Sequence, residues 1–346
     1  MHKLLCIGQE WRGSNASGLF HAFSRVGCAV SILDDHRHIS LSTRGTALKL
    51  AERFLRPLQV REYNARLLSM ARAFKPDLVF VYKGPFVDPE TLHQLKRMAL
   101  PVVNFFPDVS FTAHGSRIVR SMPHYDFVFT TKSFGASDLQ KNFGVPGSRV
   151  HFIPHGFDPF IHRRLVDPNP IFACEASFIG TYSPHKERYL AYLKSVMPGL
   201  GLLIWGNWEK SKVAELKKSI CGMGVHGDLY ALAINQSTVN IALLSEQVAG
   251  ASRGDQITSR TFHIPGAGGF MLHQRTDELL QYFDEGKEIA CFESPGELLE
   301  KTAYYLKNDS ERKKLQENGF VRAQRDHTLD ARAREILTIL KSKSIL

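Results

Sequence analysis

The chain has 346 residues, of which 43% are apolar and 23% charged, a composition typical of a globular protein long enough for two domains. Its 44 basic and 34 acidic residues give a net charge of +10. This surplus predicts an anionic partner such as a nucleotide, a phosphorylated acceptor, a lipid surface or nucleic acid. Nucleic acid is disfavoured because the basic residues are spread out, with no RNA-reading aromatic motif or zinc-finger spacing.

The five cysteines are scattered and form no Cys-x-x-Cys pair, which favours reduced thiols over a disulfide framework or a zinc site. The apolar run near Met1 stops at Gly8, too short for a signal-peptide core. Nowhere do about 18 apolar residues run without charge. We therefore expect a cytoplasmic protein without a transmembrane segment, and the basic surplus leaves open a peripheral contact at the inner membrane face.

Apolar strands alternate with helices along the first half of the chain. Strands are predicted at residues 3–7, 29–33, 77–82, 102–106, 127–131 and 150–153. This alternation is typical of a parallel sheet whose ligands bind at the carboxyl ends of the strands. Gly8 and Gly13 have P-loop spacing, but Ser14 and Asn15 stand where Lys and Ser/Thr are required, which excludes an NTPase loop. Gly-x-Gly-x-x-Gly is also absent, so a dinucleotide dehydrogenase is disfavoured.

A second α/β series follows residues 158–170, which are rich in Pro, Asp, Asn and Arg and predict an interdomain linker. Strands are predicted at 176–180, 202–205, 239–244, 270–272 and 288–292, and helices at 210–220, 295–306, 310–325 and from 330 onward. The two series together predict two α/β domains.

Residues 260–278 contain a glycine-rich turn. A short helix is expected to end at Gly266, and Gly268 and Gly269 then turn the chain into a buried strand. A helix–turn–strand unit of this kind exposes backbone N–H groups on one side of a sheet and predicts a phosphate-binding turn. An ordinary αβ connection fits the glycines equally well.

The most specific pattern in the chain is Arg260-Thr-Phe-x-Ile-Pro-x-x-Gly-Gly-Phe270, followed by Thr-x-Glu-Leu and by Phe-x-x-Gly-Lys-Glu288. Segments 77–85, 125–132, 152–158 and 178–180 support it in the expected order. Together these segments resemble the CgeB-like glycosyltransferases, which are GT-B enzymes similar to the family-4 retaining glycosyltransferases. The resemblance covers most of the chain.

The resemblance implies a GT-B fold, in which two Rossmann-like, doubly wound parallel-sheet domains face each other across a cleft. Residues 1–160 would be the acceptor-side domain, 171–328 the nucleotide-sugar-binding domain, and 329–346 a helix packing back towards the N-terminal domain. The implied function is metal-independent, retaining transfer of a hexose from a nucleotide diphosphate sugar to a glycan, lipid or protein acceptor, as in polysaccharide biosynthesis. An inactive module that binds nucleotide or glycan is the alternative.

No Asp-x-Asp occurs, so we expect cations and backbone amides, rather than a metal ion, to neutralise the departing diphosphate. The donor-site candidates are the cations Lys186, Arg188 and Arg260, the glycines Gly180, Gly206, Gly268 and Gly269, and Glu278 for sugar hydroxyls. A solvated helix face explains Lys186 and Arg188 equally well, and Glu278 alone would stabilise a helix dipole.

Family-4 enzymes carry a Glu-x7-Glu pair, and alignment of the glycine-rich turn places His263 at its second position and Asp255 near its first. This departure puts nucleotide affinity in question, because a neutral histidine offers one acceptor where a carboxylate offers several. Asp108 and His155 follow strands of the first half and are the candidate catalytic residues towards the acceptor, with Asp255 on the donor side. A solvated loop position is the alternative for each.

Overall fold

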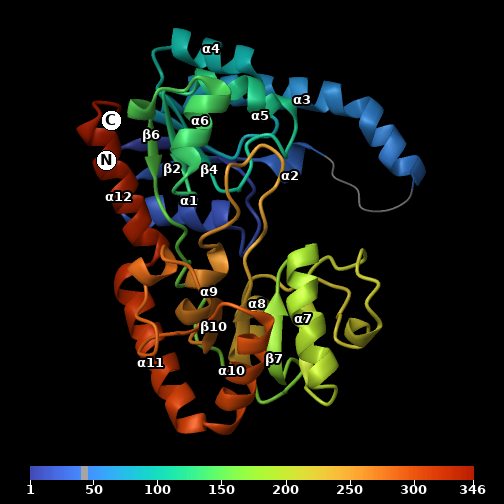
Figure 1. Cartoon of the computed structure of the whole chain (residues 1–346). Coiled ribbons are helices and arrows are strands. Elements are labelled where there is room, and N and C mark those ends of the chain that lie inside the picture. The colour runs from blue at the N-terminus through green and yellow to red at the C-terminus, as the bar shows by residue number, and fades with distance from the viewer. Residues whose placement is uncertain (40–45) are drawn as a thin grey trace. The chain divides into compact units, whose positions relative to one another are not determined.

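The structure is a computed structural model (Figure 1) that describes residues 1–39 and 46–346, with side chains described for residues 1–39 and 53–346. Contacts divide it into two compact units. Unit 1 comprises Met1–Pro154, Gln247–Arg253 and Arg332–Leu346, and unit 2 comprises His155–Glu246 and Gly254–Ala331.

Unit 1 is built on a six-stranded parallel sheet in the order β2-β1-β3-β4-β5-β6. Its strands are β1 (Lys3–Gly8), β2 (Ala29–Asp34), β3 (Leu78–Tyr82), β4 (Val102–Phe106), β5 (Phe127–Thr130) and β6 (Val150–Phe152). They lie within two residues of the predicted strands, because nearly every strand position is apolar and buried. The strand order reverses between β1 and β3, which marks the topological switch point of a doubly wound sheet.

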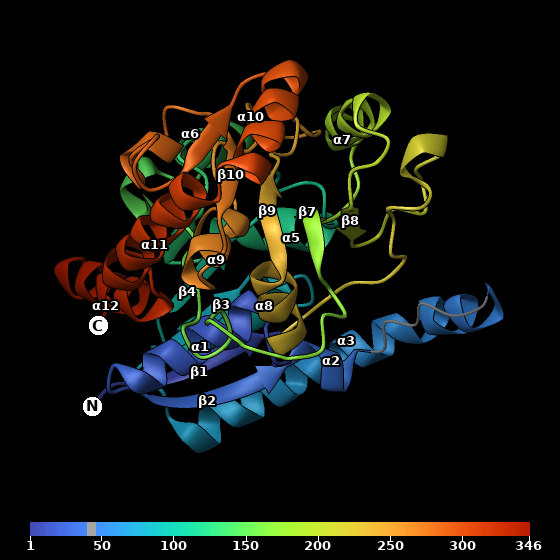
Figure 2. The ribbon, with the colours of Figure 1, turned by 90° about the horizontal axis from the view of Figure 1, so that it is seen from below.

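The helices of unit 1 cover the sheet and complete its core. They are α1 (Asn15–Arg25), α2 (Asp35–His38), α3 (Thr46–Phe74), α4 (Pro89–Arg97), α5 (Ser116–Ser121), α6 (Gly135–Phe143) and α12 (Leu329–Ser342). The first half of α3 extends beyond the strands of this unit in both views (Figures 1 and 2). No helix in the described residues is long and apolar enough to cross a membrane.

The C-terminal helix returns to the N-terminal sheet, as expected. Helix α12 contacts α1, and Ala333, Ile336 and Leu340 are fully buried along one of its faces. Their spacing of three and four residues places them on a single stripe, which is the pattern of a helix packed on a core.

Unit 2 contains a five-stranded parallel sheet in the order β11-β10-β9-β7-β8. Its elements are β7 (Cys174–Ile179), α7 (Pro184–Val196), β8 (Leu202–Trp205), α8 (Asp228–Asn235), β9 (Ser237–Ala242), α9 (Ser259–Gly266), β10 (Met271–Gln274), β11 (Ala290–Phe292), α10 (Pro295–Lys307) and α11 (Asp309–Asp326). The order reverses between β7 and β9. The expectation of two Rossmann-like parallel-sheet domains is confirmed.

Two local predictions in this unit are wrong. The expected helix at 210–220 is reduced to the 3-10 turn Ala214–Leu216, because the following residues bond to the edge strand instead, with Ile204 N–H donating to the Ser219 carbonyl. The expected linker at 158–170 begins inside unit 2: Ile161 and His162 are buried there.

Candidate functional site

Arg260, in the first turn of α9, lies where β7 and β9 end. Its Nη2 donates to the Leu243 carbonyl directly after β9 (2.7 Å), and its guanidinium lies over the Phe178 ring, 5.3 Å from the ring centre. On the β7 side it packs against Gly180, where an added Cβ would be 2.8 Å from Nη1. Arg260 therefore occupies the topological switch point of unit 2, the position at which doubly wound sheets bind their ligands.

The guanidinium of Arg260 is incompletely satisfied. Its Nε is buried without a hydrogen-bond partner, and burial lowers the pKa of Arg260 although Tyr230 and Asp255 oppose the shift. An arginine stays protonated in proteins, so a positive charge is held here. A buried donor without a partner costs stability unless a ligand supplies the acceptor.

A second cation shares this site. Lys186, in the first turn of α7, is only 2% exposed, and its Nζ donates to the Thr181 carbonyl (3.1 Å). Burial, together with repulsion from Arg260, lowers the pKa of Lys186 to about 7, while Asp255 opposes the shift. The structure thus places two cations beside the single buried carboxylate of Asp255, an arrangement that favours an anionic ligand.

Asp255 closes the loop that follows β9. Its backbone N–H donates to the Ser245 carbonyl (3.0 Å), and its Oδ2 accepts from the Ser245 N–H (3.3 Å). The carboxylate is buried within this loop, which argues against the alternative of a solvated position. These two contacts with Ser245 hold the Asp255 carboxylate near Lys186 and Arg260.

His263 lies one turn after Arg260 in a cluster of aromatic rings. It stacks on His162 with ring centres 3.8 Å apart and meets Tyr230 edge to face. Its Nε2 is buried without a hydrogen-bond partner. Burial, with His162, His155 and Arg260, lowers the pKa of His263 well below its usual value, opposed by a backbone hydrogen bond with Gly156.

Because His263 is neutral, one of its ring nitrogens carries a hydrogen and the other a lone pair. A backbone carbonyl that raises a histidine pKa accepts a ring N–H, and because Nε2 has no partner we assign that N–H to Nδ1. Nε2 then carries the lone pair and accepts hydrogen bonds. The sequence missed His162 and Tyr230 as neighbours, because no local pattern reports contacts across 101 and 33 positions.

The glycine-rich turn does not present free amides, contrary to prediction. The Gly268 N–H donates to the Pro265 carbonyl and the Gly269 N–H to the Ile264 carbonyl, each at 2.9 Å. Both bonds close the carboxyl end of α9 in the usual way for a helix that ends at glycine. These amides are therefore occupied and not available to a phosphate.

Packing, rather than ligand approach, explains the glycines. A Cβ on Gly266 would lie 2.5 Å from the Phe157 ring, and one on Gly269 would lie 2.4 Å from Ile234 Cγ2. Neither distance is compatible with a side chain. The expectation that the spacing reflects backbone approach to a ligand is therefore wrong.

Gly180 and Gly206 also use their amides within the fold. The Gly180 N–H donates to Trp205 and the Gly206 N–H to Met223, each at 2.9 Å. Gly206 has φ +125°, and a Cβ there would be 2.3 Å from the Gly180 carbonyl oxygen. The predicted free N–H of Gly180 is already bonded within the fold. What Gly180 provides is the absence of a side chain, which lets Arg260 approach the backbone closely.

Arg188 and Glu278 have different surroundings from Arg260. Arg188 is exposed on α7, and its Nη2 lies 3.3 Å from His185 Nδ1, which agrees with the alternative of a solvated helix face. Glu278 is buried directly before the 3-10 turn Leu279–Gln281, and Thr276 Oγ1 accepts from the Leu279 N–H.

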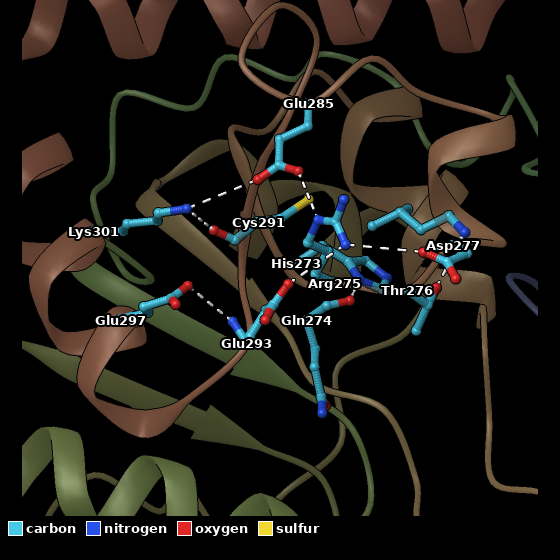
Figure 3. Close-up of polar contacts among 11 residues, drawn as sticks. His273, Gln274, Arg275, Thr276, Asp277, Glu285, Cys291, Glu293, Glu297 and Lys301 are labelled. Atoms are coloured by element: carbon cyan, nitrogen blue, oxygen red, sulfur yellow. Dashed lines mark hydrogen bonds and ion pairs between the residues drawn. The ribbon is translucent and has the colours of Figure 1, made fainter.

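Two other cations of unit 2, Arg275 and Lys301, are already neutralised by carboxylates. Figure 3 shows Arg275, directly after β10, bonded to Glu285 (3.0 Å) and Glu293 (3.4 Å), with Lys301 pairing with Glu285 (3.8 Å). In the described part of the chain, Arg260 and Lys186 form no such ion pair. This contrast singles them out as cations with capacity for a ligand.

Asp108 belongs to unit 1, at the carboxyl end of β4. Its Oδ2 forms an ion pair with Lys83 Nζ (2.6 Å) and lies 3.1 Å from His114 Nε2. Burial opposes ionisation of Asp108, yet the His114 hydrogen bond and the Lys83 charge hold the pKa of its carboxyl well below its usual range. Lys83 has φ +64°, a conformation that costs energy for a residue with a side chain.

Asp35, at the end of β2, is a further carboxylate of this edge that sequence analysis did not select. It is buried and accepts from the Tyr63 hydroxyl. Burial raises the pKa of Asp35 to about 7, although the Tyr63 bond and Lys83 lower it. The carboxyl edge of the unit 1 sheet thus holds two carboxylates, Asp108 with a lowered pKa and Asp35 with a raised pKa. Such a difference in pKa is suited to acid–base chemistry.

His155 groups with the residues of unit 2. It is buried and lies close enough to lower the pKa of His263, whereas the sequence placed it beside Asp108. No group of three or more His, Cys, Asp or Glu side chains in the described residues could hold a metal ion.

This chain resembles known proteins both in sequence and in fold. Residues 186–338 match the family model described as Glycosyl transferase-like, and the sequence matches no curated protein. Similar solved structures include sucrose-phosphate synthase from Thermosynechococcus elongatus (TM-score 0.65, 11% identity, 99% of each chain). A glycosyltransferase from Rickettsia africae ESF-5 has TM-score 0.65 and 14% identity over 99% of this chain and 98% of that one. Anabaena HepE in complex with UDP-glucose has TM-score 0.65 and 13% identity over 99% and 100%.

At these identities the solved structures establish the fold, which is GT-B as predicted. The family match covers most of unit 2 and α12, and it confirms the prediction of a glycosyltransferase-like enzyme. The narrower resemblance to the CgeB-like group stays a prediction.

Proposed function

We propose that this chain moves a hexose from a nucleotide diphosphate sugar, bound by unit 2, to a hydroxyl of a glycan, lipid or protein acceptor, which meets the carboxyl edge of the unit 1 sheet. The observation that supports this most is the pair of buried cations, Arg260 and Lys186, at the switch point of unit 2. Arg260 Nε lacks a partner there, so a diphosphate oxygen would satisfy it.

In this proposal the bond between the anomeric carbon and the diphosphate oxygen breaks, and a bond to the acceptor oxygen forms. The acceptor proton leaves with the diphosphate. Negative charge gathers on the diphosphate as the bond breaks, and Arg260 and Lys186 stabilise it without a metal ion. Retention of configuration rests on the family-4 resemblance, and NMR of the anomeric proton in the product tests it.

His263 and Asp255 are proposed to position the donor. His263 Nε2 is placed to accept a hydrogen bond from a hydroxyl of the ribose or sugar, and Asp255 balances the charge of Lys186. His155 and Glu278 remain candidates of the same unit. On unit 1, the ionised Asp108 is proposed to bind or orient an acceptor hydroxyl.

A donor panel tests the proposed function. Thermal unfolding is measured with UDP-glucose, GDP-mannose, ADP-glucose and dTDP-glucose, and a donor at 100 times its Kd is expected to add about 2.7 kcal/mol of stability. Hydrolysis or transfer is then followed with the stabilising donor. The proposal fails if no donor stabilises the protein and none is consumed.

Lys186 gives donor binding a distinctive pH dependence. With a folded pKa of about 7, Lys186 is charged below pH 7 and neutral above it, so affinity for a nucleotide sugar is expected to fall as pH rises from 7 to 9. At pH 8 binding should take up about one proton. A nucleotide sugar is the right probe, because its esterified phosphates do not titrate in this range.

Calorimetry in two buffers of different ionisation enthalpy measures this proton uptake. The matched variant Lys186→Arg stays charged, so it should bind the donor with little pH dependence between pH 7 and 9. Equal proton uptake in the variant and the parent protein would contradict the assignment to Lys186.

Substitution of His263 tests the positioning role. His263→Phe keeps an aromatic ring on His162 but removes the Nε2 acceptor, so donor Kd should rise about tenfold, as expected for one hydrogen bond. The variant also loses the hydrogen bond between Nδ1 and the Gly156 backbone, so its free energy of unfolding should fall by about 1–3 kcal/mol, and donor Kd is compared per folded molecule. An unchanged Kd would remove His263 from the donor site.

An inactive nucleotide- or glycan-binding module is the second candidate, motivated by His263 at the position of a family glutamate. It predicts donor binding without hydrolysis or transfer for every donor in the panel. Stronger donor binding by His263→Glu, with no turnover by the parent protein, would favour this candidate over the transferase.

A further inference from the structure

Helix α3 carries large apolar side chains that the core of unit 1 does not use. Phe54 is 78% exposed, Leu55 53% and Leu58 63%. One turn further along the same helix, Val60, Tyr63 and Leu67 are fully buried. At 100° per residue, Phe54, Leu55 and Leu58 fall on the side of α3 opposite to that buried stripe.

Arginines border this apolar surface. Between residues 53 and 66 the helix has four arginines and one glutamate, and Arg53, Arg61 and Arg66 are exposed. Apolar residues inserted between exposed arginines distinguish this helix from an ordinary solvated face, where charged residues of both signs alternate. An exposed apolar surface flanked by arginines is suited to the interface of an anionic bilayer.

The position of the segment makes it accessible. Figures 1 and 2 both show the first half of α3 extending past the strands of unit 1. Pro57 lies inside the helix and has no N–H to donate to the Arg53 carbonyl, so the helix can bend at this point.

We propose that residues 53–66 of α3 dock this protein on a membrane surface that contains anionic lipids. Phe54, Leu55 and Leu58 enter the boundary between headgroups and acyl chains, and Arg61 and Arg66, which flank them on the helix, contact lipid phosphates. Charge complementarity favours an anionic membrane surface as the partner of these arginines. A free phosphate ion would gain nothing from contact with the three apolar side chains. The inference does not depend on the proposed sugar transfer.

Vesicle co-sedimentation of the full chain tests the proposal. The protein should bind vesicles of phosphatidylcholine with about 30 mol % phosphatidylglycerol more strongly than phosphatidylcholine alone, since each arginine near an anionic surface contributes about fivefold. The double variant Phe54→Ser, Leu58→Ser should bind at least about tenfold more weakly. Arg61→Glu with Arg66→Glu should abolish the preference for the anionic vesicles.

Matched controls change equally exposed residues elsewhere. Val196→Ser with Val321→Ser removes two exposed apolar side chains of unit 2, and Lys217→Glu with Lys218→Glu reverses two exposed charges. Both should bind the vesicles like the parent protein. Equal losses in the controls and in the α3 variants, or no loss in the α3 variants, would overturn the proposal.

Two further measurements distinguish insertion of α3 into the membrane from association of two copies of the chain. Phe54→Trp should show quenching by brominated lipids in anionic vesicles, beyond that of the native tryptophans. Light scattering without lipid should give a monomer for both the parent protein and the Phe54→Ser, Leu58→Ser variant. If the parent protein is a dimer and this variant is a monomer, the apolar surface of α3 binds a second copy of the chain rather than a membrane.

Discussion

Arg260→Ala is expected to lower kcat/KM for sugar transfer by about 10²–10³-fold, the effect of removing one preorganised donor to a developing negative charge. The physical reason is that Arg260 holds an unpaired guanidinium Nε at the end of β7 and β9. Steady-state kinetics with the donor found in the panel measures this loss, and calorimetry separates weaker donor binding from slower turnover.

The control for this variant is Arg188→Ala, which removes an exposed arginine of the same unit and should change kcat/KM by less than about twofold. Arg260 also supports the Leu243 carbonyl, so Arg260→Ala is expected to lower stability as well. If stability falls while donor affinity and turnover per folded molecule stay unchanged, Arg260 has a structural role only.

Gly269→Ala is expected to destabilise the protein by about 1–3 kcal/mol, the usual cost of overpacking a core. The added methyl would lie 2.4 Å from Ile234 Cγ2 and 2.8 Å from Asn240 Nδ2. Because the Gly269 amide already bonds to Ile264, donor Kd per folded molecule should be unchanged. Denaturant unfolding and donor titration of the same preparation measure the two effects.

Gly296→Ala is the matched control. Gly296 lies at the start of α10, and its nearest heavy atom to an added Cβ is 3.7 Å away, so alanine should be neutral or slightly stabilising. A loss of donor affinity in Gly269→Ala without a loss of stability would restore the ligand-binding interpretation of this turn.

The sheets could be predicted from the sequence because most of the parallel strands contain a short apolar run, which in β3 (Leu78–Tyr82) is almost wholly buried. The helix expected at 210–220 failed for a reason that is not local. Its backbone groups pair with Ile204 on the edge strand β8, and no helical periodicity reveals which strand has an open edge.

Parts of the candidate site could be predicted and others could not. Arg260 and Lys186 were identified from the resemblance and the absence of a metal motif, and the structure brings them together. The glycines were misjudged, because the space around Gly266 and Gly269 is set by Phe157 and Ile234, which are distant in sequence. The histidine stack depends on contacts of the same long-range kind.

The division of unit 1 among three stretches of chain has a consequence for biosynthesis. Its last stretch, Arg332–Leu346, is made after the whole of unit 2, although domains of most proteins complete themselves from the N-terminus onward. On the ribosome, the surface of unit 1 that Ala333, Ile336 and Leu340 cover must therefore stay exposed until the whole of unit 2 has been made. Unit 2 can be complete earlier, so the nascent chain should acquire the half proposed to bind the donor before the half proposed to bind the acceptor.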